Sequence, residues 1–245
     1  NMKKVVIAVD SFKGCLSSSD IAKAVAEGIH HVIPGCEVIK VPIADGGEGT
    51  VEALTQATHG QVITIPVHNP FMQPIQASYG ITGDGQTAVI EMSAASGLDL
   101  IPRKEGNVMH TTTYGTGELI ADAVDRGCRN FIIGVGGSAT NDAGVGMMQA
   151  LGVRFTDDNG NEVEKGGKVL SAICHIDTRS QLPELSTCTF HIATDVTNPF
   201  FGPQGAAHIF GPQKGGNEMQ VEALDKGMKH LPGLILETTG RDISN

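Results

Sequence analysis

The stretch NFIIGVGGSATNDAGVGMMQAL, residues 130–151, decides the fold class of this chain. Residues 130–135 form an apolar run that predicts a buried strand, and a helix is expected over residues 141–151. The glycine-rich residues 134–144 between them predict a tight turn. A buried strand that leads into a helix through such a turn is typical of parallel α/β sheets.

The same pattern opens the chain. Residues 3–9 are a continuous apolar run that ends at Asp10, and a serine cluster at residues 17–19 then begins a helical pattern that stops near Pro34. Residues 37–42 predict a second strand and residues 47–58 a second helix. Two such units are too few for a sheet covered on both faces.

The middle of the chain predicts shorter strands and a change of domain near residues 69–70. We expect two α/β domains: residues 1–69 as part of a parallel-sheet domain, and residues 70–245 as a second α/β domain. The further elements expected are strands at 61–67, 75–81, 87–92 and 189–194, and helices at 116–126 and 218–231.

Composition limits the partners. The formal net charge of -10 argues against nucleic acid, since a phosphate-binding face needs an excess of Lys and Arg, but it permits a bound nucleotide. The 5 cysteines are odd in number and contain no CxxC, which argues against a disulfide framework and a zinc ribbon. No apolar stretch approaches the ~18 residues of a membrane span. We therefore expect a cytoplasmic protein without a membrane partner.

Two candidate ligand loops follow the first two strands, where open α/β sheets bind ligands. In DSFKG, Lys13 could meet a phosphate or carboxylate beside Asp10 and Ser11, although a turn with a solvated lysine explains the motif about equally well. In ADGGEGT, Gly46 and Gly47 would let a ligand approach the helix N-terminus closely, and Asp45 and Glu48 suit magnesium-bound phosphate or the hydroxyls of a polyol, unless Glu48 is simply a first-turn helix acid.

The glycine run of residues 134–144 fits two different kinds of ligand. The pattern GxGxx[GA], with Asp157 and Asp158 at the interval of a ribose-binding acid, predicts a dinucleotide site. Ser138, Asn141 and Asp142 favour a phosphoryl group with its metal instead, although no Walker A sequence is present. The simpler alternative is a βα turn in which Asn141 or Asp142 caps the helix.

The later motifs are weaker. Asp195 follows an apolar strand and could take a proton or ligate magnesium beside Asn198, although Asp before Asn-Pro is also common turn chemistry. Lys214 lies between glycines in GPQKGG, where its charge could bind a phosphate group. Thr116 belongs to a hydroxyl-rich segment that precedes a helix.

Taken together, seven segments resemble the bacterial glycerate kinases of the type-1 family, the GarK and GlxK type. The segments, in chain order, are DSFKG, PIADGGEGT, EMSAASGL, TTTYGTGELI, GVGGSATNDAGVG, DVTNPFFGPQGA and FGPQKG. The resemblance implies transfer of the ATP γ-phosphoryl group to D-glycerate with Mg2+, with 2-phosphoglycerate favoured over 3-phosphoglycerate. It also implies a cleft between a Rossmann-like or flavodoxin-like domain and a mixed-sheet domain, the first being completed by residues beyond 245.

We assign roles to the matching motifs as predictions. Asp195 or Asp45 would deprotonate the glycerate hydroxyl, while Lys13 and Lys214 would stabilise the charge on the phosphoryl group. The remaining predicted site residues are, for nucleotide phosphates, Gly136, Gly137, Ser138 and Asn141; for substrate, Asp10, Ser11, Gly46, Gly47, Glu48 and Thr116; and for magnesium, Asp142 and Asn198. An NAD(P)-dependent hydroxy-acid dehydrogenase and a truncated, non-catalytic ligand-binding module are the alternatives, and a homodimer is allowed.

Overall fold

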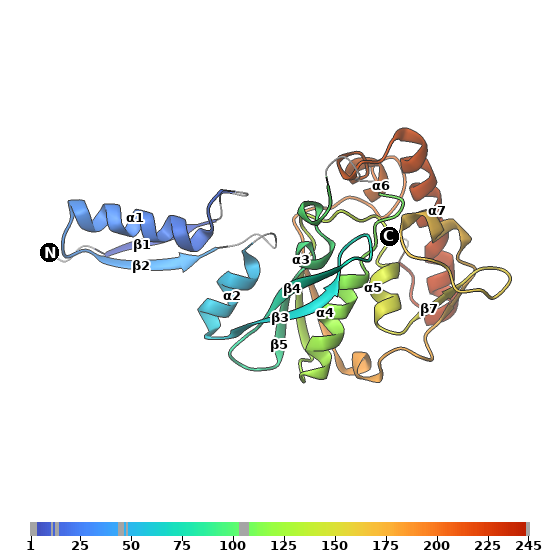
Figure 1. Ribbon diagram of the computed structural model, residues 1–245, viewed down its shortest axis with the longest axis horizontal. Coiled ribbons are helices and arrows are strands. Elements are labelled where there is room, and N and C mark those ends of the chain that lie inside the picture. The colour runs from blue at the N-terminus through green and yellow to red at the C-terminus, as the bar shows by residue number, and fades with distance from the viewer. Residues whose placement is uncertain are drawn as a thin grey trace.

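The computed structural model describes residues 4–10, 12, 15–43, 47, 49–102 and 108–243. It begins with a small unit in which β1 (Lys4–Val9) and β2 (Glu37–Pro42) pair in parallel. Helix α1 (Ser18–Val32) packs against both strands, and its first turn is capped by the Ser17 side chain, which accepts from the backbone of Asp20. This β1–α1–β2 unit extends away from the rest of the molecule (Figure 1).

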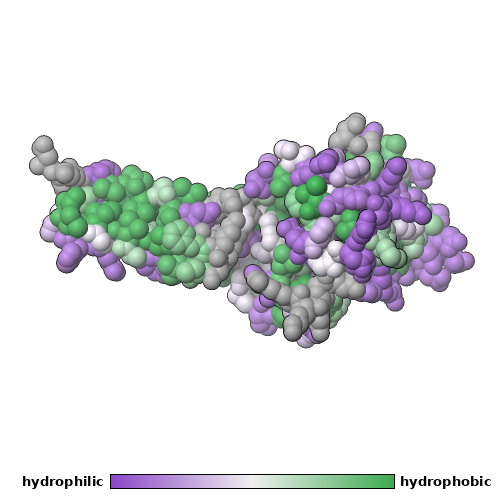
Figure 2. Space-filling model, turned by 90° about the horizontal axis from the view of Figure 1, so that it is seen from above, coloured by the Kyte–Doolittle hydropathy of each residue, from purple (hydrophilic) through white to green (hydrophobic). Residues whose placement is uncertain are grey.

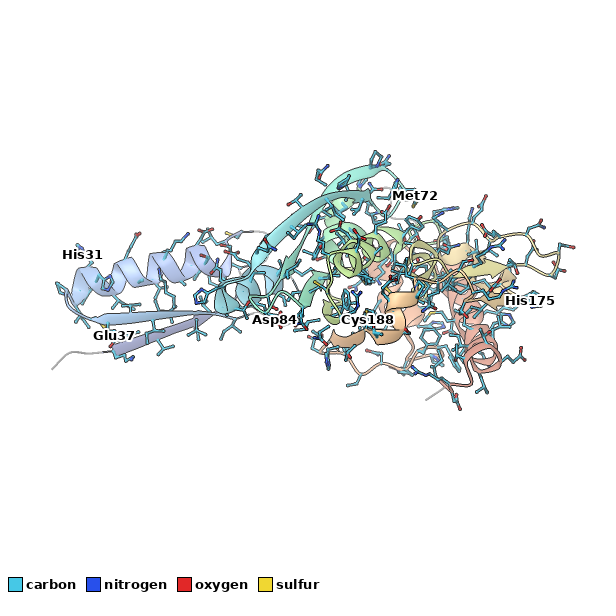
Figure 3. All side chains as sticks on the ribbon, turned by 90° about the horizontal axis from the view of Figure 1, so that it is seen from below. His31, Glu37, Met72, Asp84, His175 and Cys188 are labelled. Atoms are coloured by element: carbon cyan, nitrogen blue, oxygen red, sulfur yellow. The ribbon has the colours of Figure 1, made fainter. Side chains whose placement is uncertain are left out.

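The larger part is organised by a mixed sheet in the order β3-β4-β5-β6-β9. Its antiparallel side consists of β3 (Gln61–His68), β4 (Pro74–Ile81) and β5 (Thr87–Glu91), while β6 (Asn130–Gly134) and β9 (Thr189–Ala193) continue in parallel with β5. The carboxyl ends of β5, β6 and β9 therefore meet at one edge. Asp84 and Cys188, labelled in Figure 3, precede β5 and β9 and mark the opposite edge.

Two apolar cores support this sheet and its surroundings. In the first, α4 (Tyr114–Asp125) packs against the strands, and the fully buried Tyr79 donates its hydroxyl to Asp122. Helix α2 (Thr50–Thr58) and the short α3 (Ser93–Ser96) also contact strands of this sheet. Gly117 lets α4 approach α5 (Val145–Ala150), because a Cβ there would lie 2.3 Å from the Met147 carbonyl oxygen.

The second core is built around α7 (Glu218–Thr239), with Leu170 and Leu224 fully buried. The small hairpin-like pair β7 (Arg154–Thr156) and β8 (His175–Asp177) and helix α6 (Ala206–Phe210) complete this region. In the described residues, the elements of the two cores are connected in part by the 3-10 turns η1 (Leu98–Leu100), η2 (Gly167–Ala172), η3 (Pro183–Thr187) and η4 (Pro212–Lys214).

The structure confirms the mixed α/β class and corrects several boundaries. Helix α5 begins at Val145, not at residue 141, because Ala143 (φ 53) and Gly144 (φ 75) are left-handed and cannot continue a right-handed helix. Helix α7 runs through Pro232 to Thr239, well past the expected end at residue 231. Pro232 is buried, and this burial helps to offset the backbone hydrogen bond that proline cannot donate.

The predicted domain boundary at residues 69–70 falls in the turn of the β3–β4 hairpin, whose register runs from Gln61 opposite Ile81 to His68 opposite Pro74. Strand β3 thus belongs to the larger sheet. The division of the chain into two domains stays a prediction, and the hairpin favours drawing it before residue 61.

Apolar side chains remain exposed on the β1–α1–β2 unit, where Figure 2 shows a continuous hydrophobic surface. Val6 is 57% exposed and Val32 77%, whereas the buried cluster of the unit consists of the three small or medium side chains of Ile7, Ala22 and Ala26, with Ile21 and Cys36 buried beside them. A two-stranded sheet with so little buried surface gains little stability by itself. None of the helices in the described ranges is long and apolar enough to cross a membrane.

Candidate functional site

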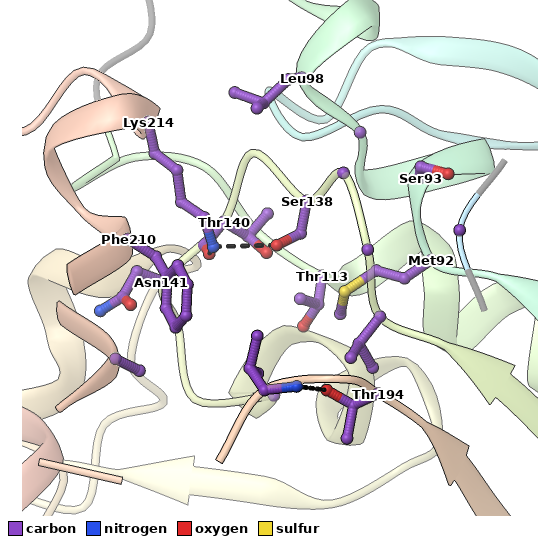
Figure 4. A pocket seen from close by; sticks show the side chains of 18 of the residues that line it. Met92, Ser93, Leu98, Thr113, Ser138, Thr140, Asn141, Thr194, Phe210 and Lys214 are labelled. Carbon is purple, nitrogen blue, oxygen red and sulfur yellow. Dashed lines mark hydrogen bonds between the residues drawn. The ribbon is translucent and has the colours of Figure 1, made fainter. Parts of the chain in front are cut away.

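A cavity of about 900 Å3 opens at the carboxyl edge of the parallel strands (Figure 4). Its walls come from the ends of β5, β6 and β9 on one side and from α6, η4 and α7 on the other. Of the described residues before residue 70, Gly47 is the one that lines this cavity. The volume lies in the range of small-molecule pockets, about 300–1,000 Å3.

The glycine turn after β6 forms one wall of this cavity. It is held by hydrogen bonds from the backbone N–H of Leu98 to the Gly137 carbonyl (2.9 Å) and from the N–H of Ala139 to the Ser96 carbonyl (2.8 Å). Gly137 has φ 70, a conformation that favours glycine. In the described part of the chain, the N–H groups of Gly136, Gly137 and Ser138 have no acceptor. Successive free N–H groups of this kind attract anions.

The side chain of Lys214 reaches this turn from η4. Its Nζ donates to Ser138 Oγ (2.9 Å) and to the Thr140 carbonyl oxygen (2.6 Å), and the residue is only 8% exposed. Burial lowers the pKa of the Lys214 ammonium to about 8, against an opposing effect of the Asp142 charge. The turn and Lys214 together form a cationic, hydrogen-bonding site for an oxyanion.

Asp142 lies beneath this turn, 1% exposed. Its carboxylate accepts from the backbone N–H groups of Thr113 (2.8 Å), Gly144 (3.1 Å) and Gly146 (3.2 Å). The hydroxyls of Thr112 and Thr113 donate to it as well. These donors occupy its lone pairs and join the first turns of α4 and α5, so we propose a structural role for Asp142 in place of the predicted magnesium ligand.

Two further predicted residues line the cavity. Asn141 is 7% exposed, and its Nδ2 donates to Met228 Sδ at 3.4 Å. Asp195 follows β9 and is exposed on the cavity wall. The structure thus brings Asn141, Asp195, Lys214 and the glycine turn together although they lie far apart in the sequence.

Other predicted residues lie elsewhere. Thr116 is fully buried with its hydroxyl 2.7 Å from that of Ser96, and Asn198 is exposed with its Nδ2 donating to the Gln204 carbonyl; neither lines the cavity. Asp10 follows β1 and also does not line it. The predicted residues Ser11, Lys13, Asp45, Gly46 and Glu48 lie outside the described residues.

Glu91 is a cavity residue to which we assigned no role from the sequence. Its Oε1 accepts from the backbone N–H of Val51 (2.9 Å) in the first turn of α2, whose N-cap, Gly49, offers no side chain. Glu91 thereby ties the first turn of α2 to the central sheet. The sequence offers a signal for Glu91: it is an acid at the end of an apolar strand, much as Asp195 is an acid that follows one.

The predicted dinucleotide fingerprint has no ribose-binding acid at Asp157, the position at which the sequence places one. Asp157 accepts from the backbone N–H groups of Asn159 and Asn161, in a turn that follows β7. Strand β7 pairs with β8 and is not part of the five-stranded sheet. A ribose-binding acid belongs in the dinucleotide-binding sheet, so this geometry does not favour the dehydrogenase alternative.

The described residues do not assemble a magnesium site from the protein alone. No group of three or more His, Cys, Asp or Glu side chains among them is arranged to hold a metal. Asp142 is saturated with donors and Asn198 points to Gln204. Magnesium in proteins is usually bound through one or two carboxylates together with the phosphates of a substrate.

The fold and cavity define an α/β protein with a candidate oxyanion-binding site at the carboxyl edge of its sheet. The model of the glycerate kinase family matches residues 5–245, and the chain belongs to this family. It is 47% identical to the glycerate 2-kinase of Escherichia coli K12, over 99% of this chain and 64% of that enzyme. It is also 47% identical to the glycerate kinase of Bacillus subtilis 168, over 97% of this chain and 62% of that protein.

A solved structure agrees with these sequence comparisons. A Salmonella typhimurium LT2 protein assigned as glycerate kinase 2 superposes with a TM-score of 0.91 at 44% identity, over 100% of this chain and 65% of that one. The chain thus spans somewhat less than two thirds of the length of these relatives.

Proposed function

We propose that this protein transfers the γ-phosphoryl group of ATP to a hydroxyl of D-glycerate. The observation that carries the proposal is the glycine turn with Lys214 on the cavity wall, an oxyanion site suited to a phosphoryl group. Formation of 2-phosphoglycerate is favoured over 3-phosphoglycerate, with support from the name of the Escherichia coli relative, glycerate 2-kinase.

In this proposal the transferring phosphoryl group lies against the N–H groups of Gly136 and Gly137 and the Lys214 ammonium. These donors offset the negative charge on the equatorial oxygens, and phosphoryl transfer depends mainly on such positioning and electrostatics. Removing the cation is expected to slow the transfer on the order of 10³-fold.

Asp195 is the proposed base for the glycerate hydroxyl, because it is exposed on the cavity wall at the end of β9. It would orient the hydroxyl and accept its proton as the oxygen attacks phosphorus. Asp45 and Lys13 stay predictions, since they lie outside the described residues.

The test is product formation by the purified chain with ATP, Mg2+ and D-glycerate. We expect glycerate-dependent ADP release, with 13C NMR showing phosphate on the 2-hydroxyl. Lys214→Met and Asp195→Asn should lose this activity, whereas Asp158→Asn, an exposed acid in the turn after β7, should retain it. ATP that binds without any glycerate-dependent ADP would leave only the ligand-binding module, and a nicotinamide absorbance change without ATP use would favour the dehydrogenase.

A further inference from the structure

The Ser138 hydroxyl and the Lys214 amine form a pair that the proposed transfer uses only as an anion site. Lys214 comes from η4, 76 residues further along the chain, yet its Nζ lies 2.9 Å from Ser138 Oγ. Figure 4 shows this contact on the cavity wall. Ser138 is half-buried, so its hydroxyl is in reach of a ligand in the cavity, while the amine behind it is buried.

The Lys214 amine has no carboxylate within ion-pair distance in the described part of the chain; its partners are a hydroxyl and a carbonyl oxygen. Among the described residues, the carboxylates that line the cavity are those of Glu91, Asp99, Asp142 and Asp195, and the charge of Asp142 acts on Lys214 from a distance. A buried cation with neutral partners releases its proton readily. The resulting neutral amine can accept the Ser138 hydroxyl proton along the same contact.

The backbone around Ser138 completes a setting for nucleophilic chemistry. A hydroxyl with a base at hydrogen-bond distance is the pattern of an activated serine. Ser138 lies in a tight turn directly after a buried strand, and the three N–H groups of Gly136, Gly137 and Ser138 remain without acceptors in the described residues. Nucleophile, base and oxyanion donors thus converge on one point of the cavity wall.

We propose that Ser138 is a phosphorylation site that receives the γ-phosphoryl group of a nucleoside triphosphate when no hydroxy acid is bound. This inference rests on the proposed function, because the triphosphate must occupy the same cavity. Ser138 Oγ forms the new bond to Pγ, the bond from Pγ to the bridging oxygen breaks, and the nucleoside diphosphate leaves with the electron pair. The hydroxyl proton passes to Lys214 Nζ, whose ammonium then pairs with the phosphoserine.

The modification has a functional consequence. A phosphate on Ser138 fills the oxyanion site formed by the glycine turn and Lys214, so the phosphorylated protein should no longer bind nucleotide phosphates there. Ser138 would thus be phosphorylated when a nucleotide is present and the hydroxy acid is not, and the site would then be blocked.

The experiment incubates the full chain with ATP and Mg2+ but without glycerate, at about pH 7 and about pH 9, and follows phosphate by intact mass and peptide mapping. We expect up to one phosphate per chain, on Ser138. Its rate should be about tenfold higher at about pH 9, because the neutral fraction of an amine with a pKa of about 8 rises from about a tenth to about nine tenths.

Two variants separate the base from the cation. Ser138→Ala should abolish labelling, and Lys214→Arg should keep a cation for the nucleotide but lose at least ~100-fold in labelling rate, because arginine does not release its proton. Calorimetric ATP binding by each variant confirms an intact cavity.

Three results would overturn the inference. The first is ATP bound by the parent chain without phosphate on Ser138, and the second is phosphate on another cavity hydroxyl such as Ser93 or Thr194. In the third, Lys214→Arg is labelled as fast as the parent chain. Glycerate phosphorylation without phosphoserine would leave the proposed function standing, and the absence of ATP binding would contradict both.

Discussion

Replacement of Asp142 by asparagine tests whether this buried acid organises the site or binds magnesium. The carboxylate accepts directly from the backbone N–H groups of Thr113, Gly144 and Gly146. The Asp142→Asn variant keeps one acceptor oxygen but turns an amide N–H2 group toward at least one of these donors. Losing one charge-assisted hydrogen bond and leaving a buried donor unpaired should cost about 2–4 kcal/mol.

The assay is urea unfolding in metal-free buffer, followed by circular dichroism. Asp142→Ala, which leaves all three N–H groups without acceptor, should cost about 3–5 kcal/mol, while the exposed control Asp158→Asn should stay within about 0.5 kcal/mol of the parent chain. A metal-free stability of Asp142→Asn within about 0.5 kcal/mol of the parent would refute the reasoning. A difference that emerged only on adding magnesium would restore the predicted metal role.

Lys214, Ala143 and the β1–α1–β2 unit each have a local property with a measurable effect. Burial lowers the pKa of Lys214 to about 8, whereas lysine in an unfolded chain has a pKa of about 10.4, so the folded chain loses this proton at lower pH. Between about pH 8 and about pH 10.4, the unfolding free energy of the parent chain minus that of Lys214→Met should therefore rise by about 3 kcal/mol. A difference that does not change with pH would contradict the burial effect. Ala143 has φ 53, a left-handed conformation that glycine adopts more easily than alanine, so Ala143→Gly should raise the unfolding free energy by about 0.5–1 kcal/mol in the same urea assay. A decrease of the unfolding free energy by that amount would show that the left-handed backbone is not strained. Hydrogen exchange should find the amides of β1 and β2 at least ~10-fold less protected than those of β5 and β6, because so few side chains are buried in the first unit; equal protection would contradict this.

The long strands and helices could be predicted from the sequence, because their apolar runs and caps are local. Strand β2 matches its expected bounds, residues 37–42, and β1 and β9 agree to within one residue. The start of α5 could not be predicted, since the left-handed backbone at Ala143 is imposed by the contacts of Asp142 with residues outside the turn. The strands β7 and β8, of three residues each, are too short for a periodic signal.

The candidate site was predictable in its parts but not in its assembly. The glycine turn, Asp195 and Lys214 each lie in motifs that follow or precede regular elements. The contact between Lys214 and Ser138 spans 76 residues and depends on how η4 and the adjoining α6 are placed beside the glycine turn. Asp142 accepts from the backbone N–H of Gly146 in the first turn of α5, although the N-cap residue of this helix is Gly144 and not Asp142.

The central claim, that the glycine turn and Lys214 hold the phosphates of ATP, is tested most directly by calorimetric titration of ATP into the parent chain and into Lys214→Met near pH 7. Loss of one charge-assisted contact worth about 1.5–3 kcal/mol predicts that ATP binds the variant about 10- to 100-fold more weakly. Asp158→Asn, measured alongside, should bind as the parent does. Equal ATP affinity of the parent chain and Lys214→Met would contradict the account.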